Sequence, residues 1–137
     1  MNEKRKVRVL LVDDEMHIRE LMKVALKDMN AEVVAEADNG KEALELFRQH
    51  KPEITIMDVN MPVMNGLETL KAIKSEFPDA FVIMLTAVSS IKAVQEILEL
   101  GASGYIRKDT SLPEIKQGIK ETWAEYMKEK KQGKKNA

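Results

Sequence analysis

The sequence predicts an α/β fold, (βα)5, in which five strands alternate with five helices and form a doubly wound parallel five-stranded sheet. Five short runs rich in β-branched and apolar residues alternate with five longer segments whose apolar residues recur at helical spacing. Asn-Gly pairs and single glycines separate several of these segments, as expected for turns. The predicted strands are Val7–Val12, Val33–Ala37, Ile54–Met57, Phe81–Leu85 and Tyr105–Ile106.

Helical segments follow the strands in order along the chain. Asn39-Gly40 precedes the second helix, Asn65-Gly66 precedes the third, and Gly101 follows the fourth, where helices commonly end in glycine. Parallel strands joined by helices need right-handed crossovers, which place helices on both faces of the sheet. The apolar positions of the five helices span Ile18–Met29, Ala43–Phe47, Leu67–Phe77, Ile91–Leu98 and Leu112–Tyr126.

The composition excludes several classes of protein. A length of 137 residues suits one domain with one core. The net charge of −1 gives no basic field that would favour direct contact with nucleic acid or an anionic membrane. The chain has no cysteine, which excludes disulfides and thiolate metal sites. The apolar run Val9–Val12 is too short for a signal peptide or a membrane span, so we expect a cytoplasmic protein.

We expect one domain over residues 1–127, including the fifth helix, and a lysine-rich flexible tail over residues 128–137. The tail has almost no apolar residue that could pack on the domain, so we expect it to fray into solvent. A basic tail is able to contact nucleic acid, but a solvated end is the simpler interpretation.

Acidic residues follow the first and third predicted strands. Asp13 and Asp14 come directly after the first strand, and Asp58 follows the third. Adjacent carboxylates repel each other, and burying either one is costly unless a positive group pairs with it. Asp13 and Asp14 also have an ordinary structural explanation, because aspartate is favoured at the start of a helix. Asp58 is also explained as a loop residue that opens the following turn. We expect Glu15 to face the start of the first helix.

Two further polar residues end the fourth and fifth strands. Considered by itself, Thr86 is explained as a β-branched strand residue. Considered by itself, Lys108 is explained as a surface lysine. Because the carboxyl ends of parallel strands meet at one edge of a sheet, both should converge with the three aspartates. Three carboxylates suit Mg²⁺, for which Mn²⁺ can substitute. A metal, a lysine, a hydroxyl and loop amides stabilise a phosphoryl group, and a carboxylate can be its acceptor.

Four stretches, "VLLVDDE", "PEITIMDVNMPVMNG", "VIMLTA" and "GASGYIRKD", together resemble the receiver domains of bacterial two-component response regulators. Their order and spacing make the resemblance specific, and it covers residues 7 to about 127. It implies a flavodoxin-like, CheY-like fold with the strand order 2-1-3-4-5. The run "GYIRKDTSLPEI" resembles the NarL/FixJ-type receivers, which are joined to a helix-turn-helix DNA-binding module.

The resemblance implies a role for each acidic residue at the strand ends. Asp58 resembles the phosphoacceptor, which takes a phosphoryl group from the phosphohistidine of a sensor kinase or phosphotransfer protein and holds it as an acyl phosphate. Asp13 and Asp14 resemble the acidic pair that holds Mg²⁺, with Asp14 as the direct ligand and Asp13 acting partly through water. Asp58 and the backbone carbonyl of Asn60 complete the metal ligands, and Lys108 resembles the lysine that pairs with the phosphoryl group.

Other residues resemble the switch that transmits the signal. Thr86 resembles the hydroxyl that moves to a phosphate oxygen, and Tyr105 the aromatic that turns inward behind it. The surface of the fourth helix, fifth strand and fifth helix would then bind an output protein or form a homodimer. Asn60 and Val88 resemble the positions that set the lifetime of the phosphoryl group, and an apolar Val88 predicts slow self-dephosphorylation. The resemblance implies a signalling switch rather than an enzyme.

The chain departs from the family pattern after Lys108, where Asp109 replaces the usual proline. That proline often follows a cis peptide bond. A cis bond before any other residue costs about 3 kcal/mol, so this bond is either trans or strained.

Three other functions stay open. A phosphatase with an aspartyl-phosphate intermediate would need an acidic residue just past the nucleophile, where this chain has Asn60. A flavin-binding module would need a first loop rich in hydroxyls and glycine, where this chain has "DDEMH". The chain also fits the receiver part of a longer DNA-binding regulator. About ten residues follow the predicted fifth helix, too few for a recognition helix and its support, which favours a stand-alone receiver.

Overall fold

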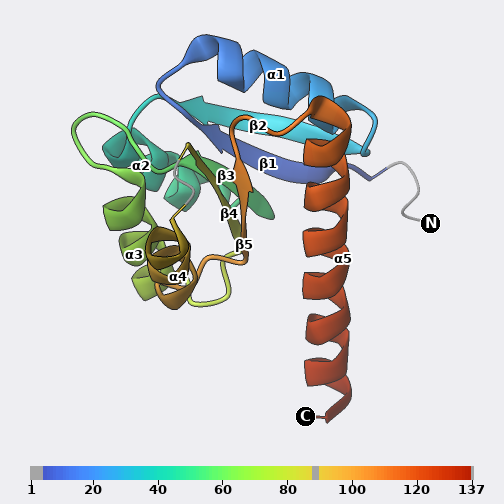
Figure 1. The fold of residues 1–137 in the computed structure, drawn as a ribbon. Helices are drawn as coiled ribbons and strands as arrows, with labels where there is room; N and C mark the ends of the chain where they lie inside the picture. The colour runs from blue at the N-terminus through green and yellow to red at the C-terminus, as the bar shows by residue number, and fades with distance from the viewer. Residues whose placement is uncertain (1–4, 88–89, 137) are drawn as a thin grey trace.

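The computed structural model describes residues 5–87 and 90–136, and strands and helices alternate along these ranges (Figure 1). The predicted (βα)5 order is confirmed, with small shifts at the ends of four strands. The elements are β1 (Val7–Val12), α1 (Met16–Lys27), β2 (Ala31–Ala37), α2 (Gly40–His50), β3 (Ile54–Asp58), α3 (Gly66–Glu76), β4 (Val82–Thr86), α4 (Ile91–Glu99), β5 (Gly104–Arg107) and α5 (Leu112–Asn136).

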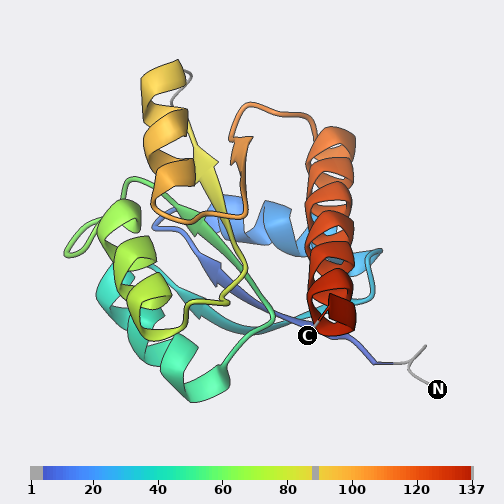
Figure 2. The same cartoon turned by 90° about the horizontal axis from the view of Figure 1, so that it is seen from below.

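All strands belong to one sheet in the order β2-β1-β3-β4-β5, and every neighbouring pair is parallel. The predicted flavodoxin-like topology is therefore confirmed. Helices α1 and α5 cover one face of the sheet, and α2, α3 and α4 cover the other (Figures 1 and 2). In the sheet, β2 lies on one side of β1 and β3 lies on the other side of β1, so the chain crosses over β1 between β2 and β3. The strand order therefore reverses at β1 and β3.

Strand β1 is buried on both of its faces. Val9 and Leu11 pack in the core beneath α1 and α5, whereas Leu10 and Val12 pack in the core beneath α2, α3 and α4. Each of these side chains is at most 1% exposed. Full burial of an aliphatic side chain contributes about 2 kcal/mol, so the unbroken apolar run anchors the turn that follows it.

The helices begin in different ways. The Asn39, Asn65 and Ser90 side chains accept hydrogen bonds from backbone N–H groups in the first turns of α2, α3 and α4. Helix α1 begins after Glu15, whose side chain makes no such bond. The capping explanation for the two preceding aspartates is therefore wrong, because neither occupies the N-cap position.

Helix α5 is longer than we predicted. It continues to Asn136, so residues 128–136 are helical where we expected a flexible tail. Lysine, glutamate and glutamine are good helix formers, and lysines near the carboxyl end of a helix interact favourably with its dipole. Figure 1 shows this end of α5 projecting beyond the sheet. The domain boundary at residue 127 stays a prediction. No helix among the described residues is long and apolar enough to cross a membrane.

We predict that Thr55→Val stabilises the protein. Thr55 is fully buried in β3, and its hydroxyl has no hydrogen-bond partner within the described part of the chain. Valine has nearly the same shape, so the substitution should raise the free energy of unfolding by about 1 kcal/mol, measured by urea denaturation.

Thr69→Val is the matched control. Thr69 is equally buried, but its hydroxyl donates to the carbonyl of Asn65 at 2.8 Å. The same substitution there should lower the free energy of unfolding by about 1 kcal/mol. The interpretation of Thr55 would be wrong if both variants were destabilised equally.

Candidate functional site

The carboxyl ends of four strands meet at one edge of the sheet and bring the predicted polar residues together. Asp13 follows β1, Asp58 ends β3, Thr86 ends β4 and Lys108 follows β5. Asp13, Asp58 and Thr86 are buried, with exposed fractions of 2%, 3% and 0%. This edge contains the point where the strand order reverses, which is where open α/β sheets bind ligands.

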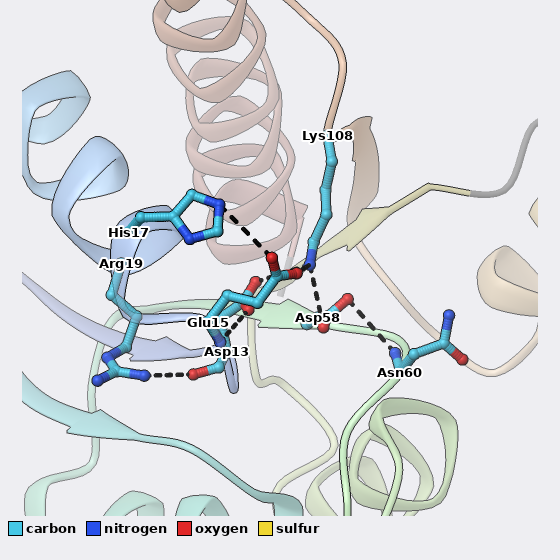
Figure 3. Close-up of polar contacts among 7 residues, drawn as sticks. All are labelled: Asp13, Glu15, His17, Arg19, Asp58, Asn60 and Lys108. Carbon is cyan, nitrogen blue, oxygen red and sulfur yellow. Dashed lines mark hydrogen bonds and ion pairs between the residues drawn. The ribbon is translucent and has the colours of Figure 1, made fainter.

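Lys108 reaches across this edge and contacts three carboxylates (Figure 3). Its Nζ atom lies 3.1 Å from Asp13 Oδ2, 3.1 Å from Asp58 Oδ2 and 3.2 Å from Glu15 Oε1. The Lys108 side chain is 15% exposed, so water and salt screen these ion pairs poorly. Removing the ammonium would leave two buried carboxylates unpaired, which is strongly destabilising. Lys108 therefore holds the ends of β1, β3 and β5 together.

Asp14 completes a cluster of three aspartates. One carboxylate oxygen from each of Asp13, Asp14 and Asp58 lies within 4.8 Å of the other two. Within the described ranges, Asp13 Oδ2 is buried and accepts no hydrogen bond, because its contact with Lys108 is an ion pair without hydrogen-bond geometry. One lysine cannot balance three carboxylates. The oxygen donors, the excess charge and the unsatisfied oxygen fit a small divalent cation such as Mg²⁺.

Burial and the neighbouring charges shift the pKa values of the buried groups. Burial, followed by the negative charge of Asp13, raises the pKa of Asp58 to about 6 against the opposing effect of Lys108. Burial also raises the pKa of Asp13, although the Glu15 N–H and Lys108 oppose the shift. For Lys108, burial disfavours the charged form, but the ion pairs with Asp58 and Asp13 outweigh it and raise the pKa. Lys108 is therefore charged at neutral pH.

The loop after β3 fixes the orientation of Asp58. The Asn60 N–H donates to Asp58 Oδ1 at 3.3 Å, while Oδ2 faces Lys108. Gly66 starts α3 directly against the strand end, because a Cβ atom there would lie 2.1 Å from the Asp58 carbonyl oxygen. Val63 is 81% exposed and has a φ of 69°, which is unusual for a β-branched residue. That the Asn60 carbonyl is a metal ligand stays a prediction.

The two predicted switch residues lie on neighbouring strands. Thr86 is fully buried, and its carbonyl accepts a hydrogen bond from the Lys108 N–H at 2.9 Å. Tyr105 is 42% exposed and pairs across the strands with Met84, two residues before Thr86. The tyrosine ring is therefore in an outward position. Val88, predicted to influence the lifetime of the phosphoryl group, lies outside the described residues.

The peptide bond between Lys108 and Asp109 is trans, which resolves the alternative left open by the sequence. The Asp109 side chain pairs with the guanidinium of Arg107 at 2.7 Å. Both side chains of this pair are largely exposed, so it contributes little to stability.

Two residues near the site were missed in the sequence. We expected Glu15 to face the start of α1, but its carboxylate turns toward Lys108 and also lies 3.5 Å from His17 Nε2. Its place directly after two aspartates is the signal that could have assigned it to the same edge. Arg19 contacts the backbone of Asp13, and no pattern in the sequence predicts that contact.

Fold and site together define a class of protein: a flavodoxin-like α/β domain with a cluster of aspartates and a lysine where its strand order reverses. The sequence model of the response regulator receiver domain matches residues 9–120. Because this match covers most of the chain, the protein belongs to the response regulator receiver family. The resemblance predicted from the motifs is confirmed.

Individual relatives differ in how much of their own length this chain matches. The chemotaxis protein CheY of Listeria monocytogenes is 41% identical, over 74% of this chain and 86% of its own length. The transcriptional regulatory protein LnrK of Bacillus subtilis is 38% identical over 82% of this chain, which spans only 52% of LnrK. The solved structure of CheY4 of Vibrio cholerae has a TM-score of 0.78 and 33% identity, covering 85% of this chain and 98% of its own.

We predict that Asp58 makes the metal-free protein less stable as the pH rises. The pKa of Asp58 is about 6 in the folded protein and about 4 in the unfolded chain. The folded state therefore binds this proton more tightly. The resulting stabilisation is complete below about pH 4 and is lost as the pH rises through 6. At pH 7 the loss amounts to about 3 kcal/mol.

Asp58→Asn isolates this effect, because asparagine has a similar shape and no charge. In EDTA, urea unfolding should give similar stabilities for the variant and the wild type at pH 4. At pH 7 the variant should be more stable by about 2 to 3 kcal/mol. A difference in stability that does not change with pH would contradict the prediction.

Proposed function

We propose that this receiver acts in the cytoplasm and takes a phosphoryl group onto Asp58 from the phosphohistidine of a sensor kinase or phosphotransfer protein. The observation that carries the proposal is the position of Asp58. Its Oδ2 atom lies 3.1 Å from the Lys108 ammonium, inside a cluster with Asp13 and Asp14 whose oxygens lie within 4.8 Å of one another.

The transfer needs an ionised and oriented Asp58. A carboxylate oxygen of Asp58 attacks the phosphorus atom, and a P–O bond forms while the P–N bond to the donor histidine breaks. The electron pair of the broken bond returns to that histidine, and an acyl phosphate remains on Asp58. Lys108 is placed to neutralise the phosphoryl oxygens, and the Asn60 N–H already holds one Asp58 oxygen in position.

We assign the Mg²⁺ ligands to Asp13, Asp14, Asp58 and the carbonyl of Asn60. Bound there, the ion would supply positive charge to the carboxylates and to the oxygens of the phosphoryl group. The unsatisfied Asp13 Oδ2 and the excess negative charge support this assignment. A related solved structure adds support, since the CheX–CheY–BeF₃–Mg²⁺ complex of Borrelia burgdorferi has a TM-score of 0.82 and 25% identity to this chain.

We propose that the phosphoryl group changes the surface of α4, β5 and α5, which binds an output protein or a second copy of the chain. The hydroxyl of Thr86 moves toward a phosphoryl oxygen, and Tyr105 turns from its present outward position into the space behind it. Ile91 and Leu98 support a docking role for this surface, because both are large apolar residues of α4 with exposed fractions of 78% and 46%. Asn60 and Val88 set the lifetime of the phosphoryl group.

The test uses a small phosphodonor in place of the kinase. Incubation with acetyl phosphate and Mg²⁺ should add the mass of one phosphoryl group to the wild type and leave Asp58→Asn unmodified. With beryllofluoride, which mimics the acyl phosphate, the amide signals of Thr86, Tyr105 and α4 should shift in NMR spectra of the wild type.

Asp28→Asn serves as the control, because Asp28 is an exposed acid on the far side of the fold that pairs with Lys116. It should be phosphorylated and respond to beryllofluoride as the wild type does. Failure of the wild type to react, or an equal reaction of Asp58→Asn, would overturn the proposed function.

A further inference from the structure

Arg19 contacts the turn that joins β1 to α1. It lies in the first turn of α1, and its side chain is 15% exposed. Its Nη1 atom donates to the backbone carbonyl of Asp13 at 2.6 Å. Figure 3 shows that Arg19 approaches Asp13 from the side opposite to Lys108. The turn that carries the acidic pair is therefore held between two cations.

The carbonyl of Asp13 belongs to the peptide unit that leads directly into Asp14. A peptide unit is planar, so fixing the direction of this carbonyl also fixes the N–H and Cα of Asp14. The pairing of β1 with its neighbours ends at Val12, so the sheet ladder does not extend to this carbonyl. Arg19 donates the hydrogen bond instead.

The other groups of Asp13 are fixed separately. Its N–H donates to the Ala37 carbonyl at 3.0 Å, and its Oδ1 atom accepts from the Glu15 N–H at 2.9 Å. These contacts hold the two ends of the turn. The contact from Arg19 acts between them, at the peptide joining the two aspartates.

Glu36, at the end of β2, keeps the guanidinium in place. Glu36 Oε1 accepts from Arg19 Nε at 3.1 Å, and Oε2 lies 2.6 Å from Lys23 Nζ. Arg19 therefore uses two edges of its planar group, one for Glu36 and one for the Asp13 carbonyl. A lysine presents a single point charge and cannot reproduce both contacts with the same geometry.

We propose that Arg19 is a positioning residue for the metal site: held by Glu36, it orients the peptide between Asp13 and Asp14 and thereby the Asp14 carboxylate. The inference rests on the proposed Mg²⁺ site and adds a residue that does not touch the ion. Groups that orient metal ligands commonly change metal affinity by about tenfold or more when they are removed.

The experiment measures Mg²⁺ binding by calorimetry on fully folded wild type, Arg19→Met, Arg19→Lys and Arg48→Met. Arg19→Met should raise the Mg²⁺ dissociation constant about tenfold. Arg19→Lys should recover only a minor part of the lost affinity, because it restores the charge without the two contacts. Without metal, the amide signals of Asp14 and Glu15 should move in NMR spectra of Arg19→Met.

Arg48→Met is the matched control. Arg48 also makes a two-point contact with a glutamate, Glu76, but this pair is exposed between α2 and α3. Its loss should leave the Mg²⁺ dissociation constant within about twofold of the wild-type value. Wild-type affinity in Arg19→Met would overturn the inference, because Arg19 would then only stabilise the fold. Full recovery in Arg19→Lys would overturn it as well, because charge rather than position would explain the loss.

Asp14→Asn separates failure of this inference from failure of the proposed site. If the wild type binds Mg²⁺ and Asp14→Asn binds it much more weakly, the metal site stands, and Arg19→Met then tests the positioning role alone. If Asp14→Asn binds Mg²⁺ as tightly as the wild type, the proposed metal site fails and the role of Arg19 fails with it.

Discussion

At 3.1 Å from both Asp13 and Asp58, the Lys108 ammonium compensates part of the negative charge that two strand ends bring together. The compensation is incomplete, because Asp14 and Glu15 add further carboxylates at the same edge. Burial, together with the negative charge of Asp13, raises the pKa of Asp58 to about 6 although Lys108 opposes the shift. A site of this kind gains stability from any group that adds positive charge, and for this reason the cluster fits a divalent cation.

The rest of the fold keeps this unfavourable arrangement in place. The two cores on either side of the sheet bury the last four residues of β1, Val9 to Val12, and so hold the acidic turn next to β3. Gly66 allows α3 to begin against Asp58, and the Asn60 N–H fixes one oxygen of that carboxylate. On the opposite side of the turn, Arg19 donates a hydrogen bond to the Asp13 carbonyl, and Glu36 accepts one from Arg19. Stability from hydrophobic burial thus offsets the electrostatic cost of the site.

The sequence predicted the sheet and the position of the site because both depend on simple patterns. Continuous apolar runs identify strands buried on both faces, and parallel strands must place their final residues at a common edge. The contact of Glu15 with Lys108 was not predictable, because it depends on one side-chain conformation at a helix start. The contact of Arg19 with the Asp13 backbone was not predictable either, because its partner is a backbone carbonyl rather than a side chain. The length of α5 was misjudged because a lysine-rich segment without apolar residues lacks the pattern that identifies a helix.

The direct measurement is the titration of the Asp58 carboxyl carbon by NMR, with and without Mg²⁺. If the carboxylate cluster and a divalent cation form one charge-balanced site, the pKa of Asp58 is about 6 in EDTA and falls to its ordinary value or below at saturating Mg²⁺. A pKa that stays the same in the presence of Mg²⁺ would show that the ion does not bind among these carboxylates. It would contradict this description of the site.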